Sequence, residues 1–284
     1  MKALAAILLL ALACHCLAAD SSLAIVHPVF SQSEDGPPVA VDYEFVPGET
    51  IYFSCQAAGF RKVDKKDDYG KQDISLKFQI QVRDAQGAIL QPVQDGKLET
   101  TLTSEDKDWQ PKLRERIEVP PLADTGEYAI LVKLSDELSA ATTETRAVFH
   151  IKGRDVAASD ALIVRNFRFL RGEEDEKPLA VAAYRPGDPV WARFEMTGYK
   201  FGEKNLVDIE YGLTVLRQDG SIAYTQPEAA TQRVQSFYRQ RYQPGVLNLN
   251  LAKDQAMGQY TIVLTVRDNV GHQTYETRET FSVE

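Results

Sequence analysis

Cysteine is scarce in this sequence, and its placement excludes a disulfide framework. Three cysteines occur in 284 residues, and two of them, Cys14 and Cys16, lie in an apolar N-terminal stretch. If that stretch is removed from the mature protein, Cys55 is left alone and no internal disulfide can form. We therefore expect the fold to depend on hydrophobic burial.

Histidine and clustered positive charge are scarce as well. Beyond the N-terminal stretch, His27, His150 and His272 are far apart, without the local spacing of a zinc or catalytic site. The acidic runs 64–73 and 173–176 lack the residue order of a calcium-binding EF-hand loop. A net charge of -9 argues against nucleic acid and anionic lipid as partners. We expect no metal and no cofactor.

The first 19 residues are organised like a secretory signal peptide. Lys2 precedes an apolar run over 3–13, and the small residues Ala18 and Ala19 follow. The run is too short to span a bilayer, and no later segment is apolar enough to do so. This predicts a secreted, periplasmic or cell-surface protein. An alternative interpretation is a lipoprotein signal, with Cys14 as the lipid anchor.

Much of the remaining chain is an internal repeat. The segment 45–60 reads F-V-P-G-E-T-I-Y-F-S-C-Q-A-A-G-F, and 184–199 reads Y-R-P-G-D-P-V-W-A-R-F-E-M-T-G-Y. The matched positions keep a constant offset within strands, and the offset changes only at loops, as expected for a duplication followed by loop trimming. We predict a first domain over 20–152, a linker over 153–160 and a second domain over 161–284.

The residue pattern within each copy indicates β-strands. Apolar residues alternate with polar ones over 74–82, which is typical of a half-buried strand. Similar alternation predicts strands at 51–57 and 128–134, and a short strand is expected at 88–93. No helical periodicity is present. The sequence therefore predicts an all-β protein of two tandem antiparallel sandwiches, with Phe53 and Phe194 pointing inward.

Two local motifs resemble known families. The segment Asp124-Thr-Gly-Glu-Tyr128 resembles the tyrosine corner of immunoglobulin-like domains, which implies a Greek-key sandwich and a Tyr128 hydroxyl bonded to upstream backbone. The second copy keeps Tyr260 but has Ala256 in place of Asp124, and neither copy has the inter-sheet disulfide of antibody domains. The stretch 177–188 resembles a strand motif of macroglobulin domains, but no thioester segment follows.

Aromatic side chains are the strongest candidates for a binding site. Flat rings with interleaved arginines suit a sugar, a peptide or another protein. The candidate ligand-binding residues are Tyr52, Trp109, Trp191, Phe237, Tyr238 and Tyr242. The alternative interpretation, which ranks ahead of a binding site, is that these rings pack loops over the sandwiches or fill the joint between them. Protein or carbohydrate is the expected partner.

No catalytic residues are predicted. Cys55 occupies an inward strand position equivalent to Phe194, so we expect it to be buried and inert, and no G-x-S-x-G segment is present. The leading hypothesis is an exported, non-catalytic binding or structural module. One alternative is a periplasmic assembly chaperone that acts by strand addition. Another is an enzyme whose carboxylates meet only in the folded protein.

Overall fold

The computed structural model describes residues 22–66 and 68–284. The predicted signal peptide, with Cys14 and Cys16, lies outside the described residues. Those described residues form β-strands and two short 3₁₀ segments, without an α-helix, which confirms the all-β prediction. The described part of the chain contains no helix long and apolar enough to cross a membrane.

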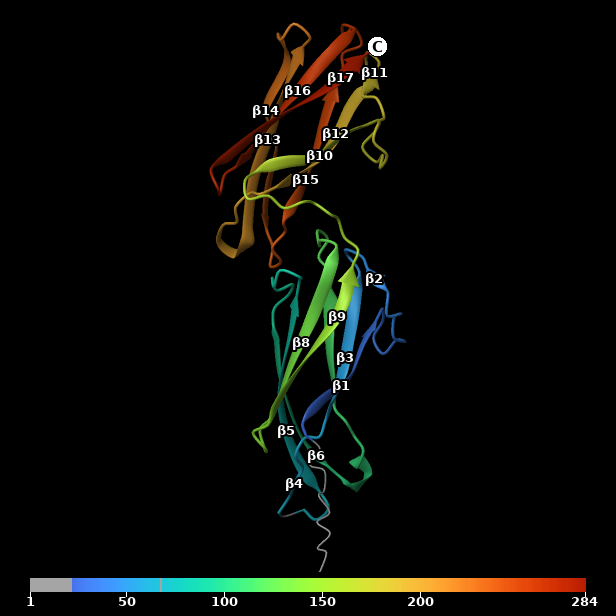
Figure 1. The fold of residues 1–284 in the computed structure, drawn as a ribbon, viewed down its shortest axis with the longest axis vertical. Coiled ribbons are helices and arrows are strands. Elements are labelled where there is room, and N and C mark those ends of the chain that lie inside the picture. The colour runs from blue at the N-terminus through green and yellow to red at the C-terminus, as the bar shows by residue number, and fades with distance from the viewer. Residues whose placement is uncertain (1–21, 67) are drawn as a thin grey trace, which may run out of the picture.

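In the N-terminal half, two sheets face each other (Figure 1). One has the strand order β1-β3-β7, and the other has the order β2-β9-β8-β5-β4, with β6 also paired to β5. The elements are β1 (Ala24–Ser31), β2 (Glu44–Phe45), β3 (Thr50–Ala58), β4 (Val63–Asp64), β5 (Gln72–Arg83), β6 (Gln94–Leu102), η1 (Ser104–Asp106), β7 (Lys112–Glu118), β8 (Gly126–Asp136) and β9 (Thr142–Ile151).

The C-terminal half has the same arrangement. A three-stranded sheet, β10-β12-β15, faces a five-stranded sheet, β11-β17-β16-β13-β14. The elements are β10 (Ile163–Leu170), β11 (Ala183–Tyr184), β12 (Pro189–Thr197), η2 (Glu203–Asn205), β13 (Leu206–Arg217), β14 (Ile222–Gln235), β15 (Tyr242–Asn250), β16 (Gly258–Asp268) and β17 (Gln273–Val283).

The two halves match even in their irregularities. The first strand of each half has a β-bulge, between Val26 and Val29 in β1 and between Arg165 and Arg168 in β10. Within each bulge one residue takes a left-handed conformation, with φ of 52° for His27 and 51° for Asn166. A β-bulge changes the direction of the strand and is usually retained among related domains. Its presence at the equivalent place in both halves therefore supports the duplication inferred from the sequence.

Each half has its own hydrophobic core. Phe53 and Phe194 are each 1% exposed and lie in separate clusters, which confirms their predicted inward orientation. Cys55 is also buried, at 1% exposure. Alternate side chains of β3 and β12 therefore close two interiors by apolar burial.

Tyr128 and Tyr260 each donate a hydroxyl hydrogen bond to the backbone carbonyl four residues earlier. The Tyr128 hydroxyl donates to the carbonyl oxygen of Asp124 at 2.9 Å, which confirms the predicted hydrogen bond. The Tyr260 hydroxyl donates to the carbonyl oxygen of Ala256 at 2.7 Å. Because the acceptor is a backbone oxygen, the change from aspartate to alanine leaves this bond intact.

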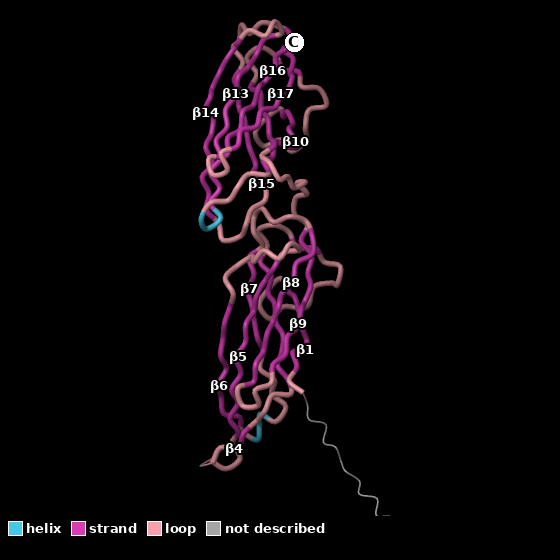
Figure 2. The backbone as a smooth tube through the Cα atoms, turned by 60° about the vertical axis from the view of Figure 1, so that its left-hand side comes forward, coloured by secondary structure: helices cyan, strands magenta, loops and turns pink. Residues whose placement is uncertain are grey.

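The predicted short strand at 88–93 is wrong. Only Ile89 forms an isolated bridge there, with Arg83, and the strand that follows is β6. Leu90 is nevertheless only 4% exposed, so the apolar residues that suggested a strand are buried as part of a loop. Loops of the two halves, drawn in pink, meet where the halves join (Figure 2).

Candidate functional site

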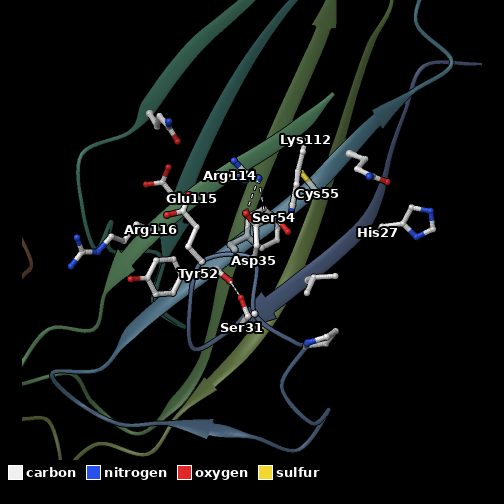
Figure 3. Close-up of a pocket in the computed structure, with 17 residues that line it drawn as sticks. His27, Ser31, Asp35, Tyr52, Ser54, Cys55, Lys112, Arg114, Glu115 and Arg116 are labelled. Atoms are coloured by element: carbon white, nitrogen blue, oxygen red, sulfur yellow. Dashed lines mark hydrogen bonds and ion pairs between the residues drawn. The ribbon is translucent and has the colours of Figure 1, made fainter. Parts of the chain in front are cut away.

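A groove of about 640 Å³ crosses the outer face of the β1-β3-β7 sheet (Figure 3). We call it the sheet groove. Its floor comes from the side chains of β3 and β7 that point away from the core. The cross-strand pairs of that floor are Tyr52–Arg116, Ser54–Arg114 and Gln56–Lys112. Strand alternation thus places an aromatic ring, two uncharged polar groups and three cations on one surface.

A loop from Gln32 to Pro38 forms one wall of the sheet groove. Asp35 reaches from this loop over the sheet, where its carboxylate lies 2.6 Å from the Lys112 ammonium and 3.0 Å from the Arg114 guanidinium (Figure 3). The hydrogen bond from Lys112 and the charges of both cations lower the pKa of Asp35 below its ordinary value. The loop is thereby fixed against the strand by charge.

The sheet groove is balanced in charge. The cations Lys112, Arg114 and Arg116 are matched by acidic groups on the loop and on β7. These acidic groups are Glu34, Asp35 and Glu115. Burial raises the pKa of Glu115, which also accepts a hydrogen bond from Gln91. A surface of this composition presents many hydrogen-bonding groups without a strong field of one sign.

Nothing in the sheet groove resembles an assembled catalytic centre. Burial raises the pKa of the Cys55 thiol to about 12, so the thiol is protonated near neutral pH and is a poor nucleophile. His27 lies exposed at the rim, on the bulge of β1. Over residues 22–66 and 68–284, no group of three histidine, cysteine, aspartate or glutamate side chains has the geometry of a metal site.

Trp191 occupies the position in the C-terminal half that Tyr52 occupies in the N-terminal half. It is half-buried on the outer face of β12, paired with Leu170 and Asn248. Further along the same face, the buried carboxylate of Glu195 accepts from Arg154 at 3.0 Å and from Arg168 at 3.4 Å. This face therefore carries an aromatic ring and, separately, a buried ion cluster.

The aromatic-basic segment 237–242, which reads F-Y-R-Q-R-Y, is divided between two environments. Tyr238 and Tyr242 are each only 4% exposed, whereas Phe237 is 54% exposed. Tyr238 belongs to the core cluster of the N-terminal half although it comes from the C-terminal half. This placement favours the alternative interpretation of Tyr238, in which it fills the joint.

Arg241 holds the joint through two carboxylates of the N-terminal half. Its guanidinium donates to Asp84 and to Asp124, each at 2.7 Å, and the Tyr238 hydroxyl donates to Asp84 at 3.1 Å. The Asp84 side chain is 1% exposed. Burial raises the pKa of Asp124, and it would lower that of Arg241, but the hydrogen bonds from Arg241 to Asp124 and Asp84 raise the Arg241 pKa above its ordinary value.

The joint carboxylates were not among the candidate binding residues selected from the sequence. Their partners lie more than a hundred residues away along the chain, so no local spacing reveals the contact. In the sequence, these residues are distinguished by comparison of equivalent positions in the two copies. The positions equivalent to Asp84 and Asp124 are Arg217 and Ala256, and the position equivalent to Arg241 is Trp109. The two halves therefore carry different charges at equivalent positions, and only the N-terminal half has the two carboxylates that bind Arg241.

Trp109 lies apart from the other candidate residues. It is 37% exposed, and it follows η1 in the loop between β6 and β7. Its backbone N–H donates to the Asp106 carbonyl at 3.1 Å. Of the six aromatic candidates, Tyr52 lines the sheet groove, Phe237 lines a second groove at the joint, and Tyr238 and Tyr242 are buried.

Comparison with known proteins yields only distant structural similarity. No family model matches the chain, and no curated protein matches it. The C-terminal domains of the antigen I/II-family protein AspA of Streptococcus pyogenes and of BspA of Streptococcus agalactiae are 9% and 12% identical. Each match covers 91% of this chain and 99% or 100% of that domain, with a TM-score of 0.29.

A glycoside hydrolase of family 123 from Clostridium perfringens shows a partial similarity. It is 12% identical over 44% of this chain, with a TM-score of 0.29. The match spans 27% of the length of the hydrolase. Similarity this distant carries no information about what the chain binds.

Proposed function

We propose that the protein is an exported, non-catalytic carbohydrate-binding module, built from two immunoglobulin-like domains over 20–152 and 161–284. Its binding site is the sheet groove. The supporting observation is the lining of that groove, where the Tyr52 ring lies among polar side chains of both charges. Sugar rings stack on aromatic faces, and their hydroxyl groups pair with amide, carboxylate and guanidinium groups.

The dimensions and charge of the sheet groove favour a neutral oligosaccharide. A volume of about 640 Å³ is within the range of ligand pockets and accommodates more than one sugar ring. The three cations are matched by three acidic groups, so an anionic sugar would gain little net attraction. The loop carrying Asp35 is fixed by ion pairs, which limits the ordering cost on binding.

Binding of neutral glycans tests this proposal directly. The mature chain, residues 20–284, is screened on an array of neutral and acidic oligosaccharides, and a binding glycan is then titrated by calorimetry. Tyr52→Ala removes the stacking ring, and Arg114→Ala removes a floor donor together with one anchor of the Asp35 loop. Trp109→Ala is the matched control, because Trp109 is an exposed aromatic residue outside the sheet groove.

We expect Tyr52→Ala to weaken binding about tenfold or more, as loss of a stacked ring does at other recognition sites. Arg114→Ala should weaken it to a similar degree, and Trp109→Ala should leave it unchanged. If no glycan binds, or if Tyr52→Ala binds as tightly as the wild type, the sheet groove is not a sugar site. Glycan turnover by the protein would contradict the non-catalytic assignment.

A further inference from the structure

A second groove, of about 660 Å³, lies where the two halves meet. We call it the joint groove. The N-terminal half contributes Ala88 and Ile89, which belong to the loop after β5. The C-terminal half contributes η2, the end of β14 and the outward side of segment 236–242. The residues from that half are Lys204, Asn205, Gln235, Ser236, Phe237 and Arg239.

The joint groove is cationic although the protein is acidic. Lys204 and Arg239 line it, and no aspartate or glutamate does. Arg241 is neutralised by two carboxylates, whereas Lys204 and Arg239 form no ion pair with the described part of the chain. Two uncompensated cations in one groove attract a ligand that carries more than one negative charge.

The wall of the joint groove is apolar and held in place. Phe237 is 54% exposed, and its carbonyl accepts from the Asn205 side chain at 2.8 Å. The Arg239 guanidinium stacks over the Phe201 ring, 4.3 Å from the ring centroid. Ala88, Ile89 and Phe237 form an apolar patch in the same lining as the two cations. Such a patch accepts an aliphatic or aromatic side chain next to carboxylates.

An open sheet edge leads into the joint groove. β14 is the terminal strand of its sheet and pairs only with β13 among the described strands. Its last residue, Gln235, lines the joint groove. From Ala230 to Gln235 the pairing with β13 is regular, because the register shift comes before Ala230. The other edge of this stretch therefore offers backbone groups to an incoming strand.

We propose that the joint groove binds an extended acidic peptide segment of a partner protein, which adds as a strand to β14. Backbone hydrogen bonds form along 230–235, an apolar side chain packs against Phe237, and carboxylates pair with Lys204 and Arg239. An oligosaccharide fits less well, because a sugar needs a dense set of planar polar groups, and the patch formed by Ile89, Phe237 and Ala88 offers none. This site is independent of the proposed sugar site.

A designed peptide tests the proposal. The probe is a short fluorescein-labelled peptide in which glutamate alternates with valine, titrated with the mature chain by fluorescence anisotropy. The test variant is Lys204→Asn with Arg239→Gln; asparagine suits the left-handed backbone at Lys204, where φ is 54°. Arg185→Gln is the matched control, since Arg185 is an exposed cation outside the joint groove.

We expect saturable binding that the double variant weakens about tenfold and that Arg185→Gln leaves unchanged. A probe N-methylated on alternate residues should lose binding, and amides over 230–235 should gain hydrogen-exchange protection with the unmodified probe. Tyr52→Ala should bind the probe normally, which separates this site from the sheet groove.

Four results would overturn the proposal. They are absence of binding, equal binding of a probe with lysine in place of glutamate, full affinity of the N-methylated probe, and full affinity of the double variant. If a polyuronic oligosaccharide bound in the joint groove and the peptide did not, the groove would be an acidic-sugar site instead.

Discussion

The guanidinium of Arg241 and the carboxylate of Asp84 lie 2.7 Å apart, although 157 positions separate them in the sequence. This ion pair joins a loop of the C-terminal half to the end of a strand in the N-terminal half. Its acidic partner is 1% exposed, so the pair is desolvated on the aspartate side. Removing one partner of such a pair leaves a buried charge without compensation, which costs more than the pair itself contributes.

We therefore predict that Arg241→Ala loosens the joint and lowers the free energy of unfolding by about 3 kcal/mol. Denaturant titration measures the loss, and small-angle scattering should show a broader distribution of distances between the halves. The control is Arg239→Ala, two residues away, whose side chain stays exposed. If both variants behaved alike, the ion pair would have no special role in the joint.

A second prediction concerns Asp136, a buried carboxylate at the end of β8. It accepts hydrogen bonds from the backbone N–H groups of Arg61 and Leu138 and from the Ser139 hydroxyl. Burial alone would raise its pKa, but these hydrogen bonds outweigh burial and hold the pKa below the ordinary value of 3.8. We expect Asp136→Ala to lower the free energy of unfolding by about 3 kcal/mol, since several charged hydrogen bonds are lost.

The sign of the pH effect follows from that lowered pKa. A carboxyl with a lower pKa in the folded than in the unfolded protein adds stability above pH 3.8, and this stability is lost as the pH falls through the folded-state pKa. Asp136→Asn should flatten this part of the acid-unfolding curve. An acid-unfolding curve unchanged in Asp136→Asn would contradict this account.

A third prediction concerns the reactivity of Cys55. Burial raises the pKa of its thiol from 9.0 to about 12. We expect no reaction with a thiol reagent at pH 8 in the native mature protein and full reaction in denaturant. Because the folded-state pKa is raised, the stability from the neutral thiol is present below pH 9 and falls as the pH rises from 9 toward 12. Cys55→Ala should remove that alkaline slope, and rapid native labelling would contradict the prediction.

A fourth prediction concerns the two tyrosine hydroxyls. Tyr128→Phe and Tyr260→Phe each remove a bond to a backbone carbonyl, and each should lower the free energy of unfolding by about 1 kcal/mol. Asp124→Ala is the informative comparison. It should leave the Tyr128 bond intact but weaken the joint, because the Asp124 side chain pairs with Arg241. Equal effects of Asp124→Ala and Tyr128→Phe on the joint would contradict this division of roles.

Features set by local sequence were predictable from the chain alone. Alternation and the internal repeat predicted the strands, the inward rings of Phe53 and Phe194 and the burial of Cys55. The corner bond of Tyr260 was harder to predict, because Ala256 lacks the aspartate side chain of the motif although its backbone carbonyl is the acceptor. The strand expected at 88–93 failed because a loop can bury Leu90 as well as a strand can.

The two grooves could not be predicted, because their residues converge only in the folded chain. Asp35 and Arg114 are distant in sequence, and their ion pair depends on a loop folding back over a sheet. Likewise, Ile89 and Phe237 meet only because one half docks on the other. The aromatic residues near 240 were conspicuous in the sequence, but whether each ring points inward or outward depends on that docking.

The two halves carry different residues at the positions that form the joint, and this difference has a consequence for engineered fusions. The N-terminal half offers two carboxylates to its neighbour, whereas the equivalent positions of the C-terminal half are Arg217 and Ala256. Trp109 likewise stands where the other copy has Arg241. A gene fusion that reversed the order of the copies, or strung several chains end to end, would create junctions without matching charges. In such products we expect the new junctions to be flexible. A rigid connection should form where Arg241 still pairs with Asp84 and Asp124.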